Sequence, residues 1–319
     1  MPDGDRQPSR GDLRLTMRVM GRLSSQVARL LLALAPGDRL PTVRTLAETN
    51  HVSVGAAQAA VAGLERVGAI EIDQRGRQGA YLRRRSFGLL WTAAEGEPLI
   101  AAMPLPNTQH CNGLATAVKS LLADAEVPAF CVFIRGSRQR LEALRHGRAH
   151  VAVMSALAAE ERLSTESIVL ELPAQTLVQE HRVYYVDRPH HGLDGRRLRV
   201  MLDRDSADFQ RLAEIEFAGN EVDFVDGTYN QLNRLLREDR ADAGIWDVEE
   251  GLVSLPPPIL SRPLSDRTLR FLRERNTRAT FVARSGDDAV RSVLAATLKP
   301  VEFVRIQREV IAGERVAEY

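Results

Sequence analysis

The amino-acid sequence predicts an α/β protein in two parts, a small basic head followed by a larger body. Three observations predict this. Residues 1–86 carry 14 arginines and 8 acidic residues, whereas residues 87–319 carry a net charge of −5. The head combines helical periodicity with a hairpin pattern, and the body alternates strand and helix patterns. A chain of 319 residues is long enough for two domains, and its 44% hydrophobic content is ordinary for a globular protein.

The head begins with three predicted helices. Apolar residues recur at helical spacing from Leu15 to Leu34, and a Pro-Gly-Asp sequence then ends the first helix. Thr42 is the expected N-cap of a short second helix, and Ser53 is the expected N-cap of a third. Gly68 suits the left-handed position at the end of the third helix.

A β-hairpin is expected directly after these helices. Strand patterns at residues 69–72 and 80–82 bracket a loop, residues 73–79, that is rich in glycine and arginine. Two short helices joined by a tight turn and followed by such a hairpin form a winged helix-turn-helix. In this arrangement the third helix enters the major groove of DNA while a basic wing lies along the phosphates.

The segment Gly37-Asp-Arg-Leu-Pro-Thr-Val-Arg-Thr-Leu-Ala47 and the glycine-containing wing resemble the winged helix of GntR-type transcription regulators, over residues 13–85. In that family the arginine matched by Arg44 contacts DNA. The family's arginines at the start of the recognition helix are absent here, since Val54 and Gln58 stand there. We therefore expect Gln58 to pair with adenine and Gly55 to allow close backbone approach. The expected DNA-binding residues are Thr42, Arg44, Ser53, Val54, Gly55, Gln58, Arg75, Gly76 and Arg77.

The body shows an alternation of buried strands and helices that predicts a parallel sheet with helices on its faces. A weak internal repeat pairs residues 144–154 with residues 236–246, and each copy combines a helix, a tight turn and a buried strand. Residues 183–186 are expected to form an extended crossing strand. We interpret the pattern as two α/β lobes, with one continuous doubly wound sheet as the alternative. The expected organisation is a flexible tail (1–11), a DNA-binding domain (12–86), a linker (87–97) and a two-lobed effector-binding domain (98–319).

The body resembles the type II periplasmic-binding-protein fold that serves as an effector domain in bacterial regulators. The motifs Ala102-Met-Pro-Leu-Pro106, Arg135-Gly136, Ser206-Ala-Asp208 and Ile245-Trp246, together with motifs in the head, make nearly the whole chain similar to YhfZ-type regulators. This resemblance implies a ligand-sensing domain on a winged-helix head, and it makes repression the expected mode of regulation. It implies no particular ligand.

The candidate ligand site lies in the loops that follow the strands, because ligands of open α/β sheets bind beyond the carboxyl ends of the strands. Arg135 ends a strand and precedes a glycine, a setting in which a guanidinium reaches a carboxylate or phosphate. Alternatively Arg135 pairs with Asp203, Asp226 or Asp247, and Ser137 and Ser206 are ordinary helix caps. The candidate ligand-binding residues are Pro104, Thr108, Arg135, Gly136, Ser137, Ser155, Asp203, Ser206, Tyr229 and Asp247.

Other classes of function lack their motifs. The sequence contains no Gly-x-Ser-x-Gly, P-loop or His-Glu-x-x-His motif, and neither Lys119 nor Lys299 has a setting suited to a Schiff base. We expect no catalytic residue, cofactor or metal. No signal peptide and no membrane-length apolar run is found, which predicts a cytoplasmic location and no membrane partner. The expected partners are a double-stranded DNA operator, a second copy of the chain and a small-molecule effector, with an anion favoured. The alternatives are a winged-helix protein-interaction scaffold whose cleft is flat or filled by side chains, and an enzyme whose active site lies on the α/β domain.

Overall fold

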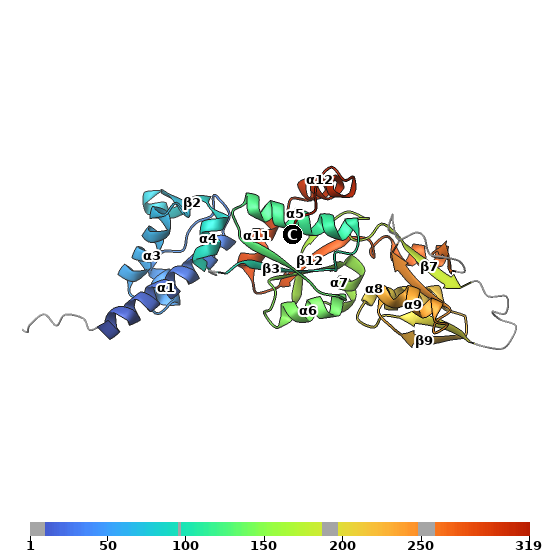
Figure 1. Ribbon diagram of the computed structural model, residues 1–319. Coiled ribbons are helices and arrows are strands. Elements are labelled where there is room, and N and C mark those ends of the chain that lie inside the picture. Colours follow the sequence, from blue (N-terminus) through green and yellow to red (C-terminus); the bar gives the residue numbers. More distant parts are fainter. Residues whose placement is uncertain (1–9, 95–96, 187–196, 248–258) are drawn as a thin grey trace, which may run out of the picture. The chain divides into compact units, whose positions relative to one another are not determined.

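The structure is a computed structural model that describes residues 10–94, 97–186, 197–247 and 259–319. Its contacts divide the chain into two compact units. The first unit contains the residues up to 99 together with residues 122–129 and 287–297. The second unit contains residues 100–121, 130–286 and 298–319. Both units are therefore assembled from segments that are far apart in the sequence, as the colours of Figure 1 show.

The first unit contains a winged helix-turn-helix, as predicted. Its elements are α1 (Arg10–Ala33), α2 (Val43–Thr49), α3 (Val54–Arg66), β1 (Ile70–Gln74) and β2 (Ala80–Arg85). The predicted caps are confirmed: the Thr42 hydroxyl accepts the amide of Thr45 at 3.1 Å, and the Ser53 hydroxyl accepts the amide of Ala56 at 3.2 Å. Strands β1 and β2 pair antiparallel and form the wing.

Helix α1 is the centre of the first unit because its buried face contacts three other helices. Leu23, Val27 and Leu31 are each about 1% exposed. Helix α1 packs against α3, against α4 (Phe87–Ala94) and against α11 (Asp288–Thr297). Helix α4 lies in the segment interpreted as a linker from the sequence, and its Trp91 is fully buried and donates a hydrogen bond to the Glu97 carbonyl at 2.8 Å.

The second unit contains two five-stranded sheets, each forming one lobe. The first lobe has the strand order β4 (Ala129–Phe133), β3 (Leu99–Met103), β5 (Val151–Ser155), β12 (Ala279–Arg284) and β6 (Glu166–Glu171). Its helices are α5 (Gln109–Asp124), α6 (Ser137–Arg145), α7 (Ala156–Arg162) and α12 (Pro300–Ile311).

The second lobe has the strand order β11 (Ile259–Pro263), β7 (His181–Val186), β10 (Ala243–Asp247), β8 (Leu198–Leu202) and β9 (Val222–Asp226). Helices α8 (Ala207–Glu216), α9 (Leu232–Arg237) and α10 (Asp266–Leu272) accompany it. The chain enters this lobe between β6 and β7 and returns to the first lobe between β11 and β12. The two-lobed type II periplasmic-binding-protein-like architecture predicted for the body is thus present, and the single continuous sheet is excluded.

Three details of the sequence-based prediction are wrong. The sheets are mixed rather than parallel: β3 pairs parallel with β5, but β12 pairs antiparallel with both β5 and β6. The expected crossing strand at residues 183–186 is β7, a member of the second sheet that pairs with β10 and β11. Ser137, expected as an ordinary helix cap, is instead the first residue of α6, whose N-cap is Gly136. Residues 287–311 form two helices, α11 and α12, because Pro300 is compatible with the first turn of a helix but not with its interior.

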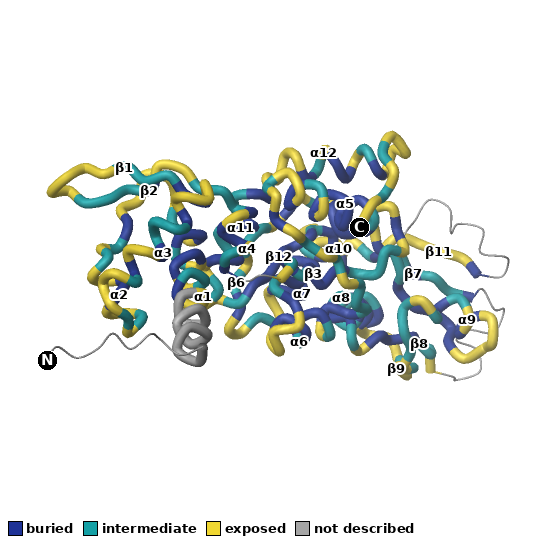
Figure 2. The backbone as a smooth tube through the Cα atoms, turned by 60° about the vertical axis from the view of Figure 1, so that its left-hand side comes forward, coloured by how far each residue is buried: buried dark blue, intermediate teal, exposed yellow. Residues whose placement is uncertain are grey.

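The core of the first lobe lies around its central strands. Strand β5 is buried along its whole length, and five of the six residues of β12 are buried (Figure 2). In the second unit Phe281 on β12 packs edge-on against Phe303 on α12, with ring centroids 5.5 Å apart. Side chains that follow the central strands are therefore held by a rigid framework, which positions the candidate site.

Candidate functional site

The first turn of helix α3 presents small or apolar residues to the surface. Val54 is 51% exposed, and Gly55 and Gln58 are also exposed. A Cβ atom added at Gly55 would have no heavy atom within 4 Å, so the packing of the head does not require glycine there. In winged helices this part of the third helix enters the major groove. Here its side chains are short, so they project little from the helix surface.

The hydroxyls of Thr42 and Ser53 serve first as helix caps. The Thr42 hydroxyl lies 2.8 Å from the hydroxyl of Thr45, in addition to accepting its amide. Ser53 accepts an amide hydrogen and keeps its own hydroxyl hydrogen for a further acceptor. Both residues therefore have an intramolecular role, and Ser53 retains the capacity to donate to a phosphate oxygen.

The wing arginines differ in how far their charge is neutralised within the chain. Arg75 bonds Asp73 at 2.7 Å and lies 4.4 Å from the ring centroid of Tyr81. Gly76 begins the turn between the strands, with φ of +55°. Arg77 is exposed, and in the part of the chain that the structure describes it has no ion pair with a carboxylate.

Two further arginine groups complete this surface. Arg44 on α2 is exposed and, like Arg77, forms no ion pair with any residue that the structure describes. Arg83 and Arg84 lie within strand β2, and both contact the carboxylate of Glu71. Arg44 and Arg77 are consequently the cations of the predicted DNA surface that have the least internal compensation.

A pocket of about 90 Å³ lies between the two lobes of the second unit, and we call it the interlobe pocket. Its polar lining comes from loops after the strands and from the first turns of helices, as predicted. The structure brings together seven of the ten candidate ligand-binding residues in its lining: Pro104, Thr108, Gly136, Ser137, Ser206, Tyr229 and Asp247.

Arg135 and Asp203 do not line the interlobe pocket, because they are paired with each other. One terminal nitrogen of Arg135 donates to both carboxylate oxygens of Asp203 at 2.9 and 2.8 Å, and the other donates to Asp205 at 2.7 Å. Gly136 has φ of +77°, and a Cβ atom there would lie 2.8 Å from the backbone oxygen of Asp205. These contacts join the lobes, and we call Arg135, Asp203 and Asp205 the interlobe clamp. The structural alternative, an ion pair at Arg135, is the arrangement observed.

The cation that does line the interlobe pocket is Arg140 on helix α6, which the sequence analysis missed. Its side chain is buried and donates to the carbonyls of Val153 at 2.6 Å and Ile134 at 2.8 Å. No carboxylate oxygen of the described residues lies within 4 Å of its guanidinium. Burial lowers the pKa of Arg140 to about 10, so the group stays protonated at neutral pH. Its position one helical turn after Ser137 is the sequence signal that points to the same place.

Two carboxylates face the interlobe pocket from the second lobe. Burial raises the pKa of Asp208 to about 6, and a hydrogen bond from the Ser155 hydroxyl at 2.5 Å opposes this shift. Ser155, a predicted ligand residue, therefore acts on the pocket through Asp208 and as the cap of α7. Asp247 ends strand β10, and one of its carboxylate oxygens lies 3.9 Å from Nε2 of His181.

His181 is buried and uncharged at neutral pH. Burial lowers the pKa of His181 to about 4. The amide nitrogen of Asn276 lies 2.8 Å from Nδ1 of the imidazole, which places the ring proton on Nε2 because an amide nitrogen only donates. The His181 ring packs edge-on against Phe209, with ring centroids 5.5 Å apart. The centroids of Phe209 and Tyr229 are 5.6 Å apart, and those of Tyr229 and Trp246 are 6.3 Å apart. One wall of the interlobe pocket is thus aromatic and carries no positive charge.

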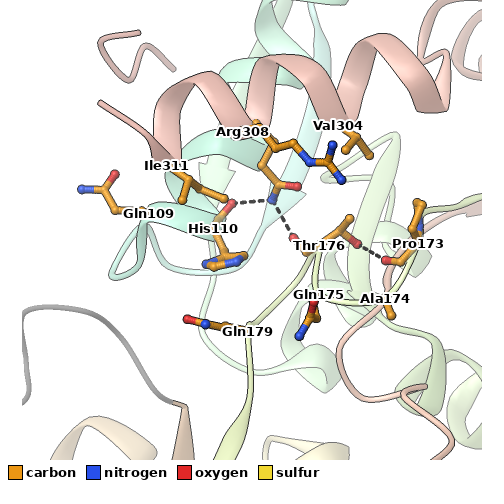
Figure 3. A pocket seen from close by; sticks show the side chains of 11 residues that line it. Gln109, His110, Pro173, Ala174, Gln175, Thr176, Gln179, Val304, Arg308 and Ile311 are labelled. Atoms are coloured by element: carbon orange, nitrogen blue, oxygen red, sulfur yellow. Dashed lines mark hydrogen bonds between the residues drawn. The ribbon is translucent and has the colours of Figure 1, made fainter. Parts of the chain in front are cut away.

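A second pocket, of about 520 Å³, lies beside helix α12 (Figure 3). Its buried amide, the side chain of Gln307, donates to the carbonyls of His110 at 2.9 Å and Thr176 at 2.7 Å. The Thr176 hydroxyl donates to the Pro173 carbonyl. Arg308, which also lines this pocket, is exposed. Because its buried polar groups are satisfied within the chain, we take the smaller interlobe pocket as the candidate ligand site.

The winged helix-turn-helix and the two-lobed α/β unit together define the class of helix-turn-helix proteins that carry a periplasmic-binding-protein-like domain. The chain belongs to the YhfZ family: the model of the YhfZ C-terminal domain matches residues 88–319, and a helix-turn-helix domain model matches residues 35–82. The resemblance to YhfZ-type proteins predicted from the sequence is thereby confirmed. Within the described residues no helix is long and apolar enough to cross a membrane.

Two proteins named YhfZ show the same relationship. The chain is 34% identical over 304 residues to the uncharacterized protein YhfZ of Escherichia coli K12, covering 94% of this chain and 97% of the relative. The crystal structure of YhfZ from Shigella flexneri superposes with a TM-score of 0.57 at 30% identity, covering 70% of this chain and 93% of that one. An OxyR mutant from Corynebacterium glutamicum matches at 13% identity with a TM-score of 0.41, covering 97% of this chain and 95% of that one.

Proposed function

We propose that this protein is a cytoplasmic DNA-binding transcription regulator, a homodimeric repressor whose affinity for its operator changes when a small molecule occupies the interlobe pocket. One observation carries the proposal. The chain combines a winged helix-turn-helix bearing the exposed arginines Arg44 and Arg77 with a pocket that contains the buried cation Arg140. The first feature suits a polyanion and the second suits a small ligand.

DNA recognition is assigned to helix α3 and the wing. Gln58 can pair with the N6 and N7 edge of adenine, and the exposed methyl groups of Val54 can contact a thymine methyl. Arg77 on the wing and Arg44 on α2 provide phosphate contacts that fix the orientation without specifying sequence. This surface has the chemistry of GntR-type heads, with glutamine in place of arginine as the base-reading residue.

Effector binding is assigned to the interlobe pocket because both lobes line it. A ligand that contacts both lobes favours the form in which the interlobe clamp is made, and it shifts the population toward that form in proportion to its differential affinity. In a dimer, this shift would alter the match of two winged helices to half-sites about 34–36 Å apart. The open volume of the interlobe pocket supports a ligand-binding role over a protein-interaction scaffold, for which a filled cleft is expected. No catalytic role is proposed for the body.

The test is binding of the full-length protein to the promoter region upstream of its own gene. Fluorescence anisotropy at low salt, with random duplex as competitor, should show preferential binding of the promoter fragment. The complex should weaken steeply as salt is added, because phosphate contacts release counterions. Absence of any preferential complex, with or without added cell extract, would overturn the regulator proposal.

A further inference from the structure

The interlobe pocket presents a positive charge on one side and a negative charge on the other. We propose that its ligand is a small amino acid bound as a zwitterion, with the carboxylate at Arg140 and the ammonium at Asp247. The inference rests on the proposed function, since it names the class of effector for the same pocket. It is argued from the charges, the aromatic wall and the volume of the pocket.

The side of the pocket that binds the carboxylate of the ligand is defined by Arg140. Its guanidinium donates to two backbone carbonyls and forms no ion pair with a carboxylate of the described residues. Asp208, which also lines the pocket, acts on Arg140 electrostatically, but its own pKa is raised to about 6. A buried charge is stabilised strongly by an opposite charge that makes hydrogen bonds with it. The hydroxyl groups of Thr108, Ser137 and Ser206 line the same pocket and are suited to donate to carboxylate oxygens. An anionic group is therefore the natural partner on this side.

The side of the pocket that binds the ammonium group of the ligand is defined by Asp247 and the aromatic wall. The side chain of Asp247 is 15% exposed, and the rings of Tyr229 and Trp246 line the pocket beside it. Neutral His181 adds no positive charge to this wall. A carboxylate next to aromatic faces is the combination that binds organic ammonium groups. Asp208 is less suited to this role, because burial raises its pKa to about 6 and the carboxyl is therefore less fully charged than an ordinary aspartate near neutral pH.

A single short ligand can reach both sides. Arg140, Tyr229 and Asp247 line the same interlobe pocket, so a ligand that fills the pocket contacts the groups on both sides. The interlobe pocket, at about 90 Å³, is small beside the roughly 300–1,000 Å³ of sites for drug-sized ligands. A ligand of few atoms is therefore favoured, and small amino acids are the probes that match it.

Isothermal titration calorimetry of the full-length protein without DNA tests this directly, with glycine, L-alanine and L-serine as zwitterionic probes. Propionate and ethylamine each keep one charged group of alanine. We expect at least one amino acid to bind about tenfold to a hundredfold more tightly than both singly charged analogues. Equal binding of L-alanine and propionate would overturn the proposal, and so would the failure of all three amino acids to bind. Because no DNA is present, either result is independent of the outcome of the promoter experiment.

Variants locate the two charges. Asp247→Asn should lower the affinity for the amino acid toward that of propionate. Asp226→Asn, at the exposed end of the edge strand β9 of the same sheet, should leave the affinity unchanged. Arg140→Met should abolish the preference for a carboxylate over ethylamine. If Arg140→Met does not fold, because Arg140 also donates hydrogen bonds to two backbone carbonyls, the comparison of ligands and the Asp247→Asn variant still test the zwitterion proposal. Unchanged amino-acid affinity in Asp247→Asn would contradict the assignment of the ammonium site.

Discussion

Charged residues of the same type have different roles around the interlobe pocket because their neighbours differ. Arg135 and Arg140 are five residues apart, yet the first is compensated by Asp203 and Asp205 while the second bonds only backbone carbonyls. Likewise Asp203 is part of the interlobe clamp, whereas Asp208 is held by a serine and has a raised pKa. Which charge stays available to a ligand is thus decided by the distance to the nearest opposite charge.

Asp208→Asn should make the protein more stable above about pH 6. Because burial raises the pKa of Asp208 to about 6, the folded state keeps a proton that the unfolded chain loses near pH 4. Stability therefore falls as pH rises from about 4 to about 6, and the variant, whose amide still accepts the Ser155 hydroxyl, is free of this loss. We expect a gain of about 1–2 kcal/mol at pH 7. Thermal unfolding from pH 4.5 to 7.5 measures it, and a difference that does not grow with pH would contradict the assignment.

Gly55→Ala should separate stability from DNA binding. Alanine favours a helix over glycine by up to about 1 kcal/mol, and nothing lies within 4 Å of the added Cβ atom, so the free energy of unfolding should rise. The same methyl group would hold the backbone away from the bases and lower operator affinity by about tenfold.

Gly63→Ala is the matched control for this experiment, because Gly63 lies on α3 beyond its first turn and is equally free of neighbours. It should gain stability and keep its affinity in the anisotropy assay. Equal operator affinities of Gly55→Ala and Gly63→Ala would argue against a close approach of the helix backbone to the DNA bases at Gly55.

At the level of elements, local signals were predictable and distant pairings were not. The N-caps Thr42, Ser53 and Ser206 were predicted because a cap depends on the few residues that follow it. Strand β12 was missed because its partners β5 and β6 lie more than a hundred residues earlier in the chain. The pocket lining was largely predicted from strand ends, but Arg140 was missed because only tertiary structure shows that Arg135 is already paired.

The wing should respond unequally to the loss of its two arginines. Arg77→Ala should reduce the slope of log affinity against log salt by about one unit, because an exposed cation without an internal ion pair gives a full phosphate contact. Arg75→Ala should reduce it less, since Arg75 is partly compensated by Asp73 and stacked on Tyr81.

Arg148→Ala removes an exposed arginine of the second unit and is the control, for which no change in slope is expected. The measurement is promoter binding at several salt concentrations. A larger effect at Arg75 than at Arg77 would show that the internal contacts of Arg75 are given up on binding.

At the level of the whole molecule, each compact unit is built from discontinuous segments. The chain passes between the units at residues 99–100, 121–122, 129–130, 286–287 and 297–298. Helix α11, whose buried face includes Val290, Val293 and Leu294, packs on α1 of the winged-helix unit although more than 250 residues separate the two helices. The fold of the head therefore depends on residues near the far end of the sequence.

Leu294→Ala should destabilise the first unit. Truncating a fully buried leucine costs about 2–5 kcal/mol. The two tryptophans of the chain allow this to be followed, because Trp91 lies in the first unit and Trp246 in the second. In a Trp246→Phe background, the urea midpoint reported by Trp91 fluorescence should fall in Leu294→Ala.

Leu236→Ala, a buried leucine of the second lobe, is the control and should leave the Trp91 transition in place. An unchanged midpoint in Leu294→Ala would show that the winged helix is stable without the contribution of α11.

The placement of α11 also matters for anyone who wishes to build hybrid sensors from this scaffold. Cutting the gene after the wing and joining the first 86 codons to a foreign receptor would leave the long first helix without part of its apolar cover. A working chimaera would have to supply a replacement for residues 287–297, so the portable module is a set of separate stretches and not one contiguous cassette.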